Sequence, residues 1–210
     1  MLRKNTLEKF SETLGSNAPA PGGGSVSALA GSLGADLISM VCSLSVDLPE
    51  FSDHQAMLGN AQKEAQMLSG KLMILVDLDT EAFNAVMKAY KMPKDSDLQK
   101  TERKKAIQEG FKQAVQSPLE TAENCLKVLK LAETLISRIN LNALSDFGVG
   151  AQMAKAGLEG AVMNIRINLP SIKDQEYVKS KSKKANHMLE EGDRISETTY
   201  KYVNSSLGGS

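Results

Sequence analysis

The stretch from Leu68 to Tyr90 constrains the fold of this chain more than any other part of the sequence. Its apolar residues recur at spacings of three and four, which places them along one face of an α-helix. The residues on this face are Leu68, Leu72, Leu75, Ala82, Val86 and Tyr90. Asp79 lies on the same face, where the pattern calls for an apolar residue. The sequence therefore predicts a helix that carries one carboxylate within its packing surface.

A carboxylate in that position needs a partner or a proton. Burying it unpaired costs several kcal/mol, so such groups are paired, hydrogen-bonded or shifted to a higher pKa. Each of these states would suit an acid used in catalysis. A structural carboxylate that accepts hydrogen bonds from a neighbouring helix fits the pattern equally well, because structural networks also perturb pKa values. The periodicity leaves both interpretations of Asp79 open.

Helical periodicity recurs along most of the chain, between loops rich in glycine, proline and serine. The 210 residues include ten methionines and no tryptophan, and only 4% are aromatic, a composition that favours helices over strands. We expect helices over residues 5–14, 26–44, 54–90, 97–116, 118–139, 140–169 and 172–204. This pattern predicts an all-α fold, a single-domain helical bundle of five to eight helices that includes residues 1–210.

Particular residues are expected to mark the helix boundaries. Asn5 and Ser25 stand where the first two helices need caps, and Ser96 or Asp97 can cap the helix that follows residue 95. Pro118 is expected in the first turn of a separate helix, where a missing N–H is tolerated.

Charge and cysteine usage exclude several classes of function. Lys plus Arg and Asp plus Glu both number 25, so no broad basic field favours a nucleic acid or an anionic membrane. We find no secretory leader and no run of about eighteen apolar residues. Cys42 and Cys125 lack metal-ligand spacing, and His54 and His187 have no partner at helical spacing. We therefore expect a soluble cytoplasmic protein with no metal site.

The segment from residue 16 to residue 25, SNAPAPGGGS, is expected to form a loop before a helix. The backbone N–H groups of Gly22, Gly23 and Gly24, with Ser25, would offer an anionic ligand a site at the helix N-terminus. A glycine run is also an ordinary flexible connector. A polar line along the following helix is expected to face solvent or a cleft, and it consists of Ser25, Ser32, Asp36, Ser39 and Ser43.

The stretch from residue 140 to residue 169 is the second informative one. At about 100° per residue, its core stripe consists of Phe147, Ala151, Ala154, Leu158, Val162, Ile165 and Leu169. A separate line consists of Asp146, Gly150, Gly157, Gly160, Asn164 and Asn168. Each glycine costs a helix about 1 kcal/mol relative to alanine, so something must approach this line closely. Either another helix crosses it, or a flat ligand lies on it with the aspartate and the asparagines at its polar edge.

Six ordered segments of the chain carry a resemblance to a known family. They are residues 19–41, residues 76–83 (VDLDTEAF), residues 91–97 followed by Arg103, residues 117–119, residues 140–149, and residues 160–169 with Asp174. In order and spacing they resemble the formimidoyltetrahydrofolate cyclodeaminase family. That family comprises stand-alone bacterial enzymes, the C-terminal half of formiminotransferase-cyclodeaminase, and bacterial methenyltetrahydrofolate cyclohydrolases.

The resemblance implies an all-helical fold, homodimers or higher homo-oligomers, and a folate site near a subunit interface. It also implies that the second acid of the VDxDxxAF motif, Asp79, is catalytic, and that the glycine loop and the asparagine line form the folate pocket. The chain departs from the family pattern at two positions. Asp36 stands where the family usually has a small residue, and Ile139 stands where it has glycine.

The expected reaction is that of an ammonia-lyase, a cyclodeaminase in the one-carbon metabolism of histidine degradation. It converts 5-formiminotetrahydrofolate into 5,10-methenyltetrahydrofolate and ammonia, with Asp79 as the proton shuttle and no metal or redox cofactor. Asp146, Asn164 and Asn168 would hold the tetrahydrofolate derivative. Four basic residues are candidates for the glutamate tail: Lys88, Lys91, Arg103 and Arg166.

Two other interpretations stay open at this point. A methenyltetrahydrofolate cyclohydrolase would use the same pocket. A non-catalytic helical dimerisation scaffold would use the glycine line only as a helix-crossing seam. For the cyclodeaminase, a formiminotransferase would belong to a separate polypeptide.

Overall fold

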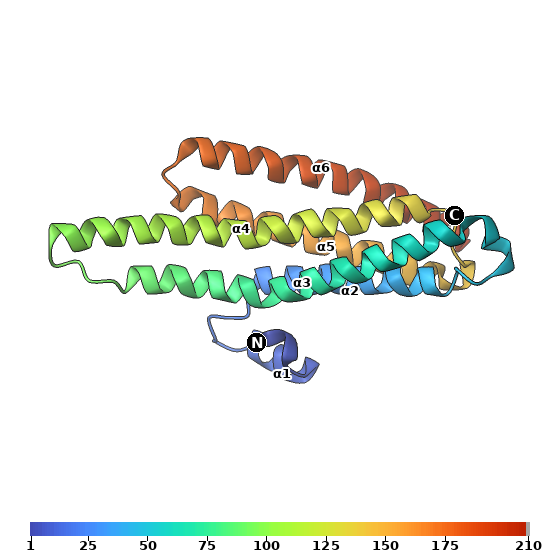
Figure 1. Ribbon diagram of the computed structural model, residues 1–210, viewed down its shortest axis with the longest axis horizontal. Coiled ribbons are helices and arrows are strands. Elements are labelled where there is room, and N and C mark those ends of the chain that lie inside the picture. Colours follow the sequence, from blue (N-terminus) through green and yellow to red (C-terminus); the bar gives the residue numbers. More distant parts are fainter. Residues whose placement is uncertain (209–210) are drawn as a thin grey trace.

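The computed structural model describes residues 1–208, which form an elongated bundle of helices (Figure 1). The α-helices are α1 (Leu7–Leu14), α2 (Gly23–Ser43), α3 (Gln55–Tyr90), α4 (Asp97–Leu135), α5 (Leu144–Asn168) and α6 (Gln175–Ser206). Short 3-10 helices are η1 (Leu2–Lys4), η2 (Pro49–His54), η3 (Leu141–Ala143) and η4 (Leu169–Ser171). Residues 1–208 contain no strand. The predicted all-α bundle is confirmed, with six α-helices.

Helix α2 is the central element of the bundle. It packs against α3, α4 and α5, while α6 covers α4 and α5 from outside and α1 stands apart on the opposite side (Figure 1). By length and composition alone α2 could cross a membrane, but 67% of its most apolar stretch is buried inside the bundle. Its apolar composition is therefore accounted for by its contacts with three other helices.

Glycines bring α2 and α5 into close contact. A Cβ at Gly34 would lie 2.7 Å from the Gly150 carbonyl oxygen, and one at Gly157 would lie 2.7 Å from the Ser27 carbonyl oxygen. The glycines of residues 140–169 thus lie where another helix, α2, crosses α5. The helix-crossing alternative for that line is therefore confirmed at its glycines. The seven residues of the predicted core stripe on α5 and η4 are all buried.

The predicted polar line of α2 is confirmed only in part, because Asp36 and Ser43 are exposed and its other members are not. Ser25, Ser32 and Ser39 are buried, and the hydroxyl oxygens of Ser32 and Ser69 lie 3.0 Å apart across the contact with α3. Ser25 is not the N-cap, because α2 begins at Gly23 and Gly22 occupies the cap position. Ser25 and Ser32 satisfy their hydroxyls within the bundle, so these two positions need neither solvent nor a ligand.

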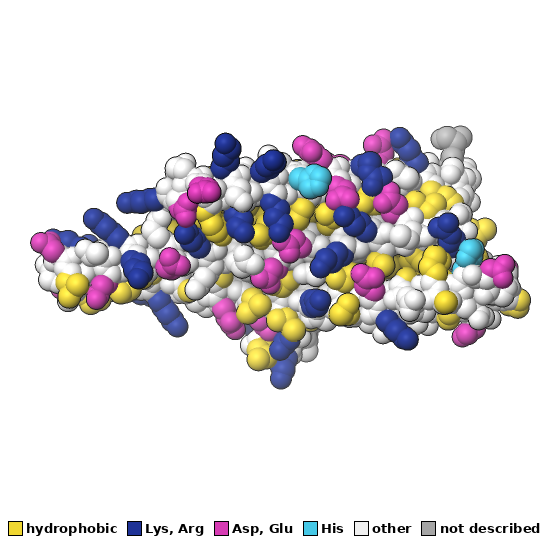
Figure 2. All heavy atoms as spheres, turned by 45° about the horizontal axis from the view of Figure 1, so that its top comes forward, with side chains coloured by type: hydrophobic (Ala, Val, Ile, Leu, Met, Phe, Trp, Pro, Cys, Tyr) yellow, Lys and Arg dark blue, Asp and Glu magenta, His cyan; other side chains and the backbone are white. Residues whose placement is uncertain are grey.

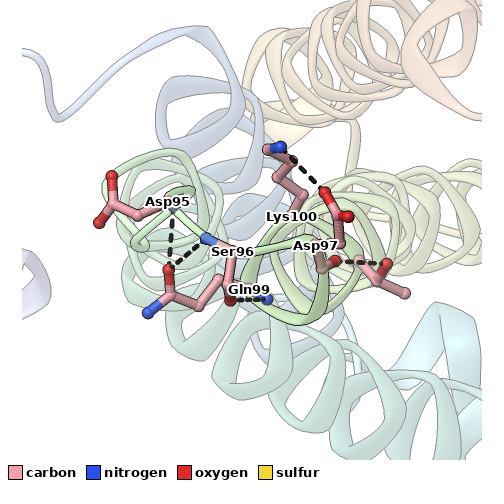
Figure 3. Close-up of polar contacts among 6 residues, drawn as sticks. Asp95, Ser96, Asp97, Gln99 and Lys100 are labelled. Atoms are coloured by element: carbon pink, nitrogen blue, oxygen red, sulfur yellow. Dashed lines mark hydrogen bonds and ion pairs between the residues drawn. The ribbon is translucent and has the colours of Figure 1, made fainter.

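The loop between α3 and α4 ends in a capping box (Figure 3). The Ser96 hydroxyl accepts from the Gln99 N–H at 3.2 Å, and the Gln99 side-chain oxygen accepts from the Ser96 N–H at 3.1 Å. Ser96 is therefore the cap, as one of the two predicted candidates. At the start of α1, Thr6 is the cap and the prediction of Asn5 is wrong, because the Thr6 hydroxyl accepts from the Lys9 N–H.

The predicted break at Pro118 is absent, because α4 runs continuously from Asp97 to Leu135 with Pro118 inside it. Pro118 has no N–H to donate to the Ala114 carbonyl one turn earlier. The side-chain amide of Asn168, from the end of α5, donates to that carbonyl at 3.3 Å. A residue far away in the sequence thus compensates for the hydrogen bond that proline removes.

This compensation generates a prediction. Asn168→Ala leaves the Ala114 carbonyl without a donor and should lower the free energy of unfolding by about 1 to 3 kcal/mol. In a Pro118→Ala background the loss should be smaller, because residue 118 then donates within the helix. Urea unfolding followed by circular dichroism measures both values. An equal loss in the two backgrounds would contradict this account of Pro118, and the exposed Asn84→Ala serves as the control.

Candidate functional site

A cavity of about 390 Å³ lies where the N-terminus of α2 meets α3, α4 and α5. Its walls come from the loop before α2 (Pro19, Ala20), the glycine run (Gly22, Gly23, Gly24), α3 (Asp79, Thr80, Ala82, Phe83, Val86, Met87, Tyr90), α4 (Phe111, Ala114) and α5 (Asn164, Ile167, Asn168). Residues from four separate parts of the chain therefore meet at one site. Elsewhere, on the face that Figure 2 shows, Lys and Arg are interspersed with Asp and Glu.

Asp79 is the one carboxylate among the described residues that line this cavity. It is half-buried, and the Ser25 hydroxyl donates to its Oδ2 at 3.1 Å. Burial raises the pKa of Asp79 above its ordinary value of 3.8, and hydrogen bonds from the Ser25 side chain and backbone lower it in part. The net shift is upward, so this carboxyl group exchanges its proton closer to neutral pH than an exposed aspartate does.

The glycine run allows Asp79 to reach the N-terminus of α2. A Cβ at Gly24 would lie 2.0 Å from Asp79 Oδ1, and Gly22 has no side chain to cap the helix. Asp79 supplies the acceptor that a capping side chain would otherwise supply. The Asp79 carboxylate therefore lies against the glycine run, beside the predicted anion site. The structural interpretation of Asp79 is confirmed, since Asp79 accepts hydrogen bonds from Ser25 on a neighbouring helix, and its raised pKa leaves the catalytic interpretation as a prediction.

The other acid of the same motif has a separate role. Asp77 accepts from the backbone N–H groups of Leu2 and Arg3, and the Arg3 Nε lies 3.2 Å from Asp77 Oδ2. It anchors the N-terminal segment against α3 and does not line the cavity.

The structure brings most of the predicted site residues together. Gly22, Gly23, Gly24, Asp79, Asn164 and Asn168 line one cavity. Ser25 is fully buried behind Asp79 and does not line it. Asp146 does not belong to this cavity, because it lies near the opposite end of α5, about 27 Å from Asn164 by the helical rise. Grouping Asp146 with the asparagines is corrected: a shared helix face says nothing about position along the axis.

The two asparagines present acceptors to a ligand. The Asn164 amide nitrogen donates to the Gly160 carbonyl at 2.8 Å. The Asn168 amide nitrogen donates to the carbonyls of Asn164 at 2.8 Å and Ala114 at 3.3 Å. Because both partners of Asn168 are carbonyl oxygens, its NH₂ group must face them, and its oxygen is left as an acceptor. A ligand edge that carries N–H groups would match these amide oxygens.

The cavity has an aromatic and apolar wall that the sequence analysis did not predict as a ligand surface. Phe83, Met87 and Tyr90 line the cavity and are 39%, 40% and 46% exposed. The rings of Tyr90 and Phe111 pack edge to face, with their centroids 6.2 Å apart. The sequence does contain a pattern that indicates this wall. Phe83, Met87 and Tyr90 follow Asp79 at spacings of four, four and three, which places them on the same face of the helix. Such a wall suits a flat aromatic ligand.

Among the four basic candidates, Arg103 is held against a residue of the cavity wall. Its guanidinium donates to the Tyr90 carbonyl at 3.1 and 3.3 Å, and its Cζ lies 5.7 Å from the Tyr90 ring centroid. Arg166 instead donates to Asn186 on α6, and Lys88 and Lys91 are exposed. Arg103 is therefore the candidate that lies next to the wall formed by Tyr90.

The chain was compared with known proteins. A family model described as formiminotransferase-cyclodeaminase matches residues 6–187. A methenyltetrahydrofolate cyclohydrolase from Methylorubrum extorquens is 36% identical over 207 residues, 99% of this chain and 100% of that protein. The formimidoyltransferase-cyclodeaminase of Gallus gallus is 35% identical over 185 residues, 88% of this chain and 34% of that protein. The chain thus spans about a third of the length of the Gallus gallus protein.

The fold was compared in the same way. The crystal structure of formiminotetrahydrofolate cyclodeaminase from Thermotoga maritima matches with a TM-score of 0.82 and 26% identity. The match covers 100% of this chain and 98% of that one.

The raised pKa of Asp79 predicts a pH-dependent cost in stability. With a folded-state pKa above the unfolded one, the wild-type protein loses stability as the pH rises from the unfolded pKa through the folded pKa. Asp79→Asn has no carboxyl group at this position and does not lose stability in this way. The melting temperature of the variant relative to wild type should therefore rise between pH 4 and pH 8. Glu81→Gln, at an exposed position on the same helix, is the matched control. A difference between Asp79→Asn and wild type that does not change with pH would contradict the prediction.

Two Gly→Ala variants should have opposite effects. Gly24→Ala forces the Asp79 carboxylate away from α2 and should destabilise the fold by about 1 to 3 kcal/mol. Gly70→Ala, at an exposed position inside α3 with open space around it, should stabilise the fold by up to about 1 kcal/mol. Chemical unfolding measures both. A neutral Gly24→Ala would show that Asp79 does not need to lie where the structure places it.

Proposed function

The chain belongs to the formiminotransferase-cyclodeaminase family, and from this premise we propose that it catalyses acid–base chemistry on the one-carbon unit between N5 and N10 of a tetrahydrofolate derivative. The observation that carries the proposal is Asp79. It is a carboxyl group of raised pKa at the wall of a cavity that also has aromatic side chains and amide acceptors. Such a group can both accept and donate a proton during one turnover.

The first candidate is the cyclodeaminase reaction of 5-formiminotetrahydrofolate. N10 attacks the formimino carbon and forms the C–N bond of the new ring, and Asp79 takes the N10 proton. The imino nitrogen must gain two protons before it leaves as ammonia. Asp79 returns the N10 proton to it, and solvent supplies the second. The breaking C–N bond leaves 5,10-methenyltetrahydrofolate, and Asp79 is again ionised, ready for the next turnover.

We infer a place in the cavity for each part of such a substrate. The amide oxygens of Asn164 and Asn168 match the N–H groups along the edge of the pterin ring. The aminobenzoyl ring would lie against Phe83, Tyr90 and Phe111. Arg103, beside Tyr90, would attract the carboxylates of the glutamate tail.

The second candidate is the methenyltetrahydrofolate cyclohydrolase reaction. Its specific support is the match over 100% of the Methylorubrum extorquens protein, which is named for that reaction. Water would attack the methenyl carbon, and Asp79 would take one proton from the water. The C–N5 bond would then break, with Asp79 returning that proton to N5 and the hydroxyl proton passing to solvent, which leaves 10-formyltetrahydrofolate. Both reactions pass through a carbon bonded to both N5 and N10, so the same acid serves both.

We also propose that the protein forms a homodimer or a larger homo-oligomer. Met163 and Ile167, on the outer side of α5, are 65% and 75% exposed, and α1 has no buried residue. A second copy would cover such surfaces. Light scattering coupled to gel filtration measures the assembly.

The decisive experiment mixes the protein separately with 5-formiminotetrahydrofolate and with 5,10-methenyltetrahydrofolate. Methenyltetrahydrofolate absorbs in the near ultraviolet, so a rise in the first mixture identifies a cyclodeaminase, and an accelerated fall in the second identifies a cyclohydrolase. Asp79→Asn should lower kcat by about 10²- to 10⁴-fold, while Glu81→Gln retains it. Turnover by Asp79→Asn at the wild-type rate would eliminate Asp79 as the proton shuttle.

A further inference from the structure

Ser25 lies directly behind the proposed catalytic acid and out of reach of a ligand. Its side chain is 0% exposed and does not line the cavity. Its hydroxyl oxygen lies 2.9 Å from the Val76 carbonyl oxygen, 3.1 Å from Asp79 Oδ2 and 3.5 Å from the Thr80 hydroxyl oxygen. The sequence predicted Ser25 as a substrate contact, and its burial gives it a different neighbour, the carboxylate itself.

A count of hydrogens shows what this arrangement does. A hydroxyl group has one hydrogen to donate, and the Val76 carbonyl can only accept. When Asp79 is protonated, it donates to Ser25 and Ser25 donates to Val76, so every group is satisfied. When Asp79 is ionised, it can only accept, and the two acceptors compete for the single hydrogen of Ser25.

The competition can be resolved in favour of the carboxylate. Val76 lies inside α3, so its carbonyl also accepts from the N–H of Thr80 one turn later. It therefore keeps a partner when Ser25 rotates away. The ionised carboxylate is the stronger acceptor, because charge-assisted hydrogen bonds are about twice as strong as neutral ones. Thr80, which lines the cavity, can then donate to the Ser25 oxygen.

The charged groups near this cluster are engaged or face elsewhere. On α3, Asp77 pairs with Arg3, and Glu81 lies in a different surface groove. The elements packed against Asp79 contribute neutral groups to the cavity wall: the glycine run from α2, Phe111 and Ala114 from α4, and Asn164 from α5. The one other titratable side chain that lines the described cavity is Tyr90. Ser25 is thus the adjustable hydrogen-bond donor nearest to Asp79.

We propose that Ser25 is the positioning residue of Asp79, and that its hydroxyl hydrogen alternates between the Val76 carbonyl and the Asp79 carboxylate as the carboxyl group gains and loses its proton. The inference rests on the proposed function for its kinetic consequence. The carboxyl group can change its charge without moving, because a neighbouring hydroxyl rotates in its place.

The test compares Ser25→Ala with Ser27→Ala. Ser27 is a buried serine on the same helix, and its hydroxyl donates to the Gly23 carbonyl at 2.7 Å without touching Asp79. Ser25→Ala removes both the donor to the ionised carboxylate and the acceptor of the protonated one. The first bond is charge-assisted and the stronger, so the acidic limb of the pH profile of kcat/KM should shift upward by about one pH unit. Ser27→Ala should leave that limb in place. A reduced rate with an unshifted limb in Ser25→Ala would overturn the proposal.

A second measurement needs no turnover. Infrared difference spectra between wild type and Asp79→Asn isolate the carboxylic C=O stretch of Asp79, whose pH titration gives its protonation directly. That titration should move upward in Ser25→Ala and return toward wild type in Ser25→Thr, which restores a hydroxyl and also covers the case in which Ser25→Ala folds poorly. An unmoved titration overturns the role of Ser25. A wild-type protein that turns over neither folate overturns only the proposed function.

Discussion

The close contact between α2 and its neighbours is the constraint on which the rest of the structure depends. Glycines at the crossings with α5 let the two backbones approach, and buried serines satisfy their own hydroxyls against α3. A helix held on several sides has little freedom to slide along its axis, because close-packed interiors transmit strain and do not absorb it. The N-terminus of α2 is therefore placed accurately at the turn of α3 that carries Asp79.

At that junction two opposing effects act on one carboxylate. Removal from water favours the protonated form, whereas the free N–H groups of a helix N-terminus favour the ionised form. Burial wins at Asp79, but hydrogen bonds from Ser25 limit the shift. The outcome is a carboxyl group whose pKa is raised, but by less than burial alone would raise it. The contact with the N-terminus of α2 and the raised pKa of Asp79 are then two consequences of one geometry.

Sequence periodicity predicted the helical fold, the core stripe of α5 and the unusual position of Asp79, because each depends only on the direction of a side chain around its helix. Features that depend on a partner elsewhere in the chain were not accessible in this way. Pro118 stays inside α4 because Asn168 replaces its missing donor, and no local pattern reveals that. Asp146 lies on the same face of α5 as Asn164 but near the opposite end of the helix. Phe111 reached the site through packing alone.

The anchoring of two chain segments by Asp77 and Asp79 has a topological consequence. These acids lie two positions apart on α3. That spacing is a rotation of about 200° around the helix axis, so the two side chains point to nearly opposite sides of the helix. Asp77 accepts from Leu2 and Arg3, and Asp79 accepts from the Ser25 hydroxyl. The chain between these points is a tethered loop closed at both ends on one rigid helix. Because loop-closure entropy changes slowly with length, insertions within α1 would lengthen this segment at little cost in closure entropy.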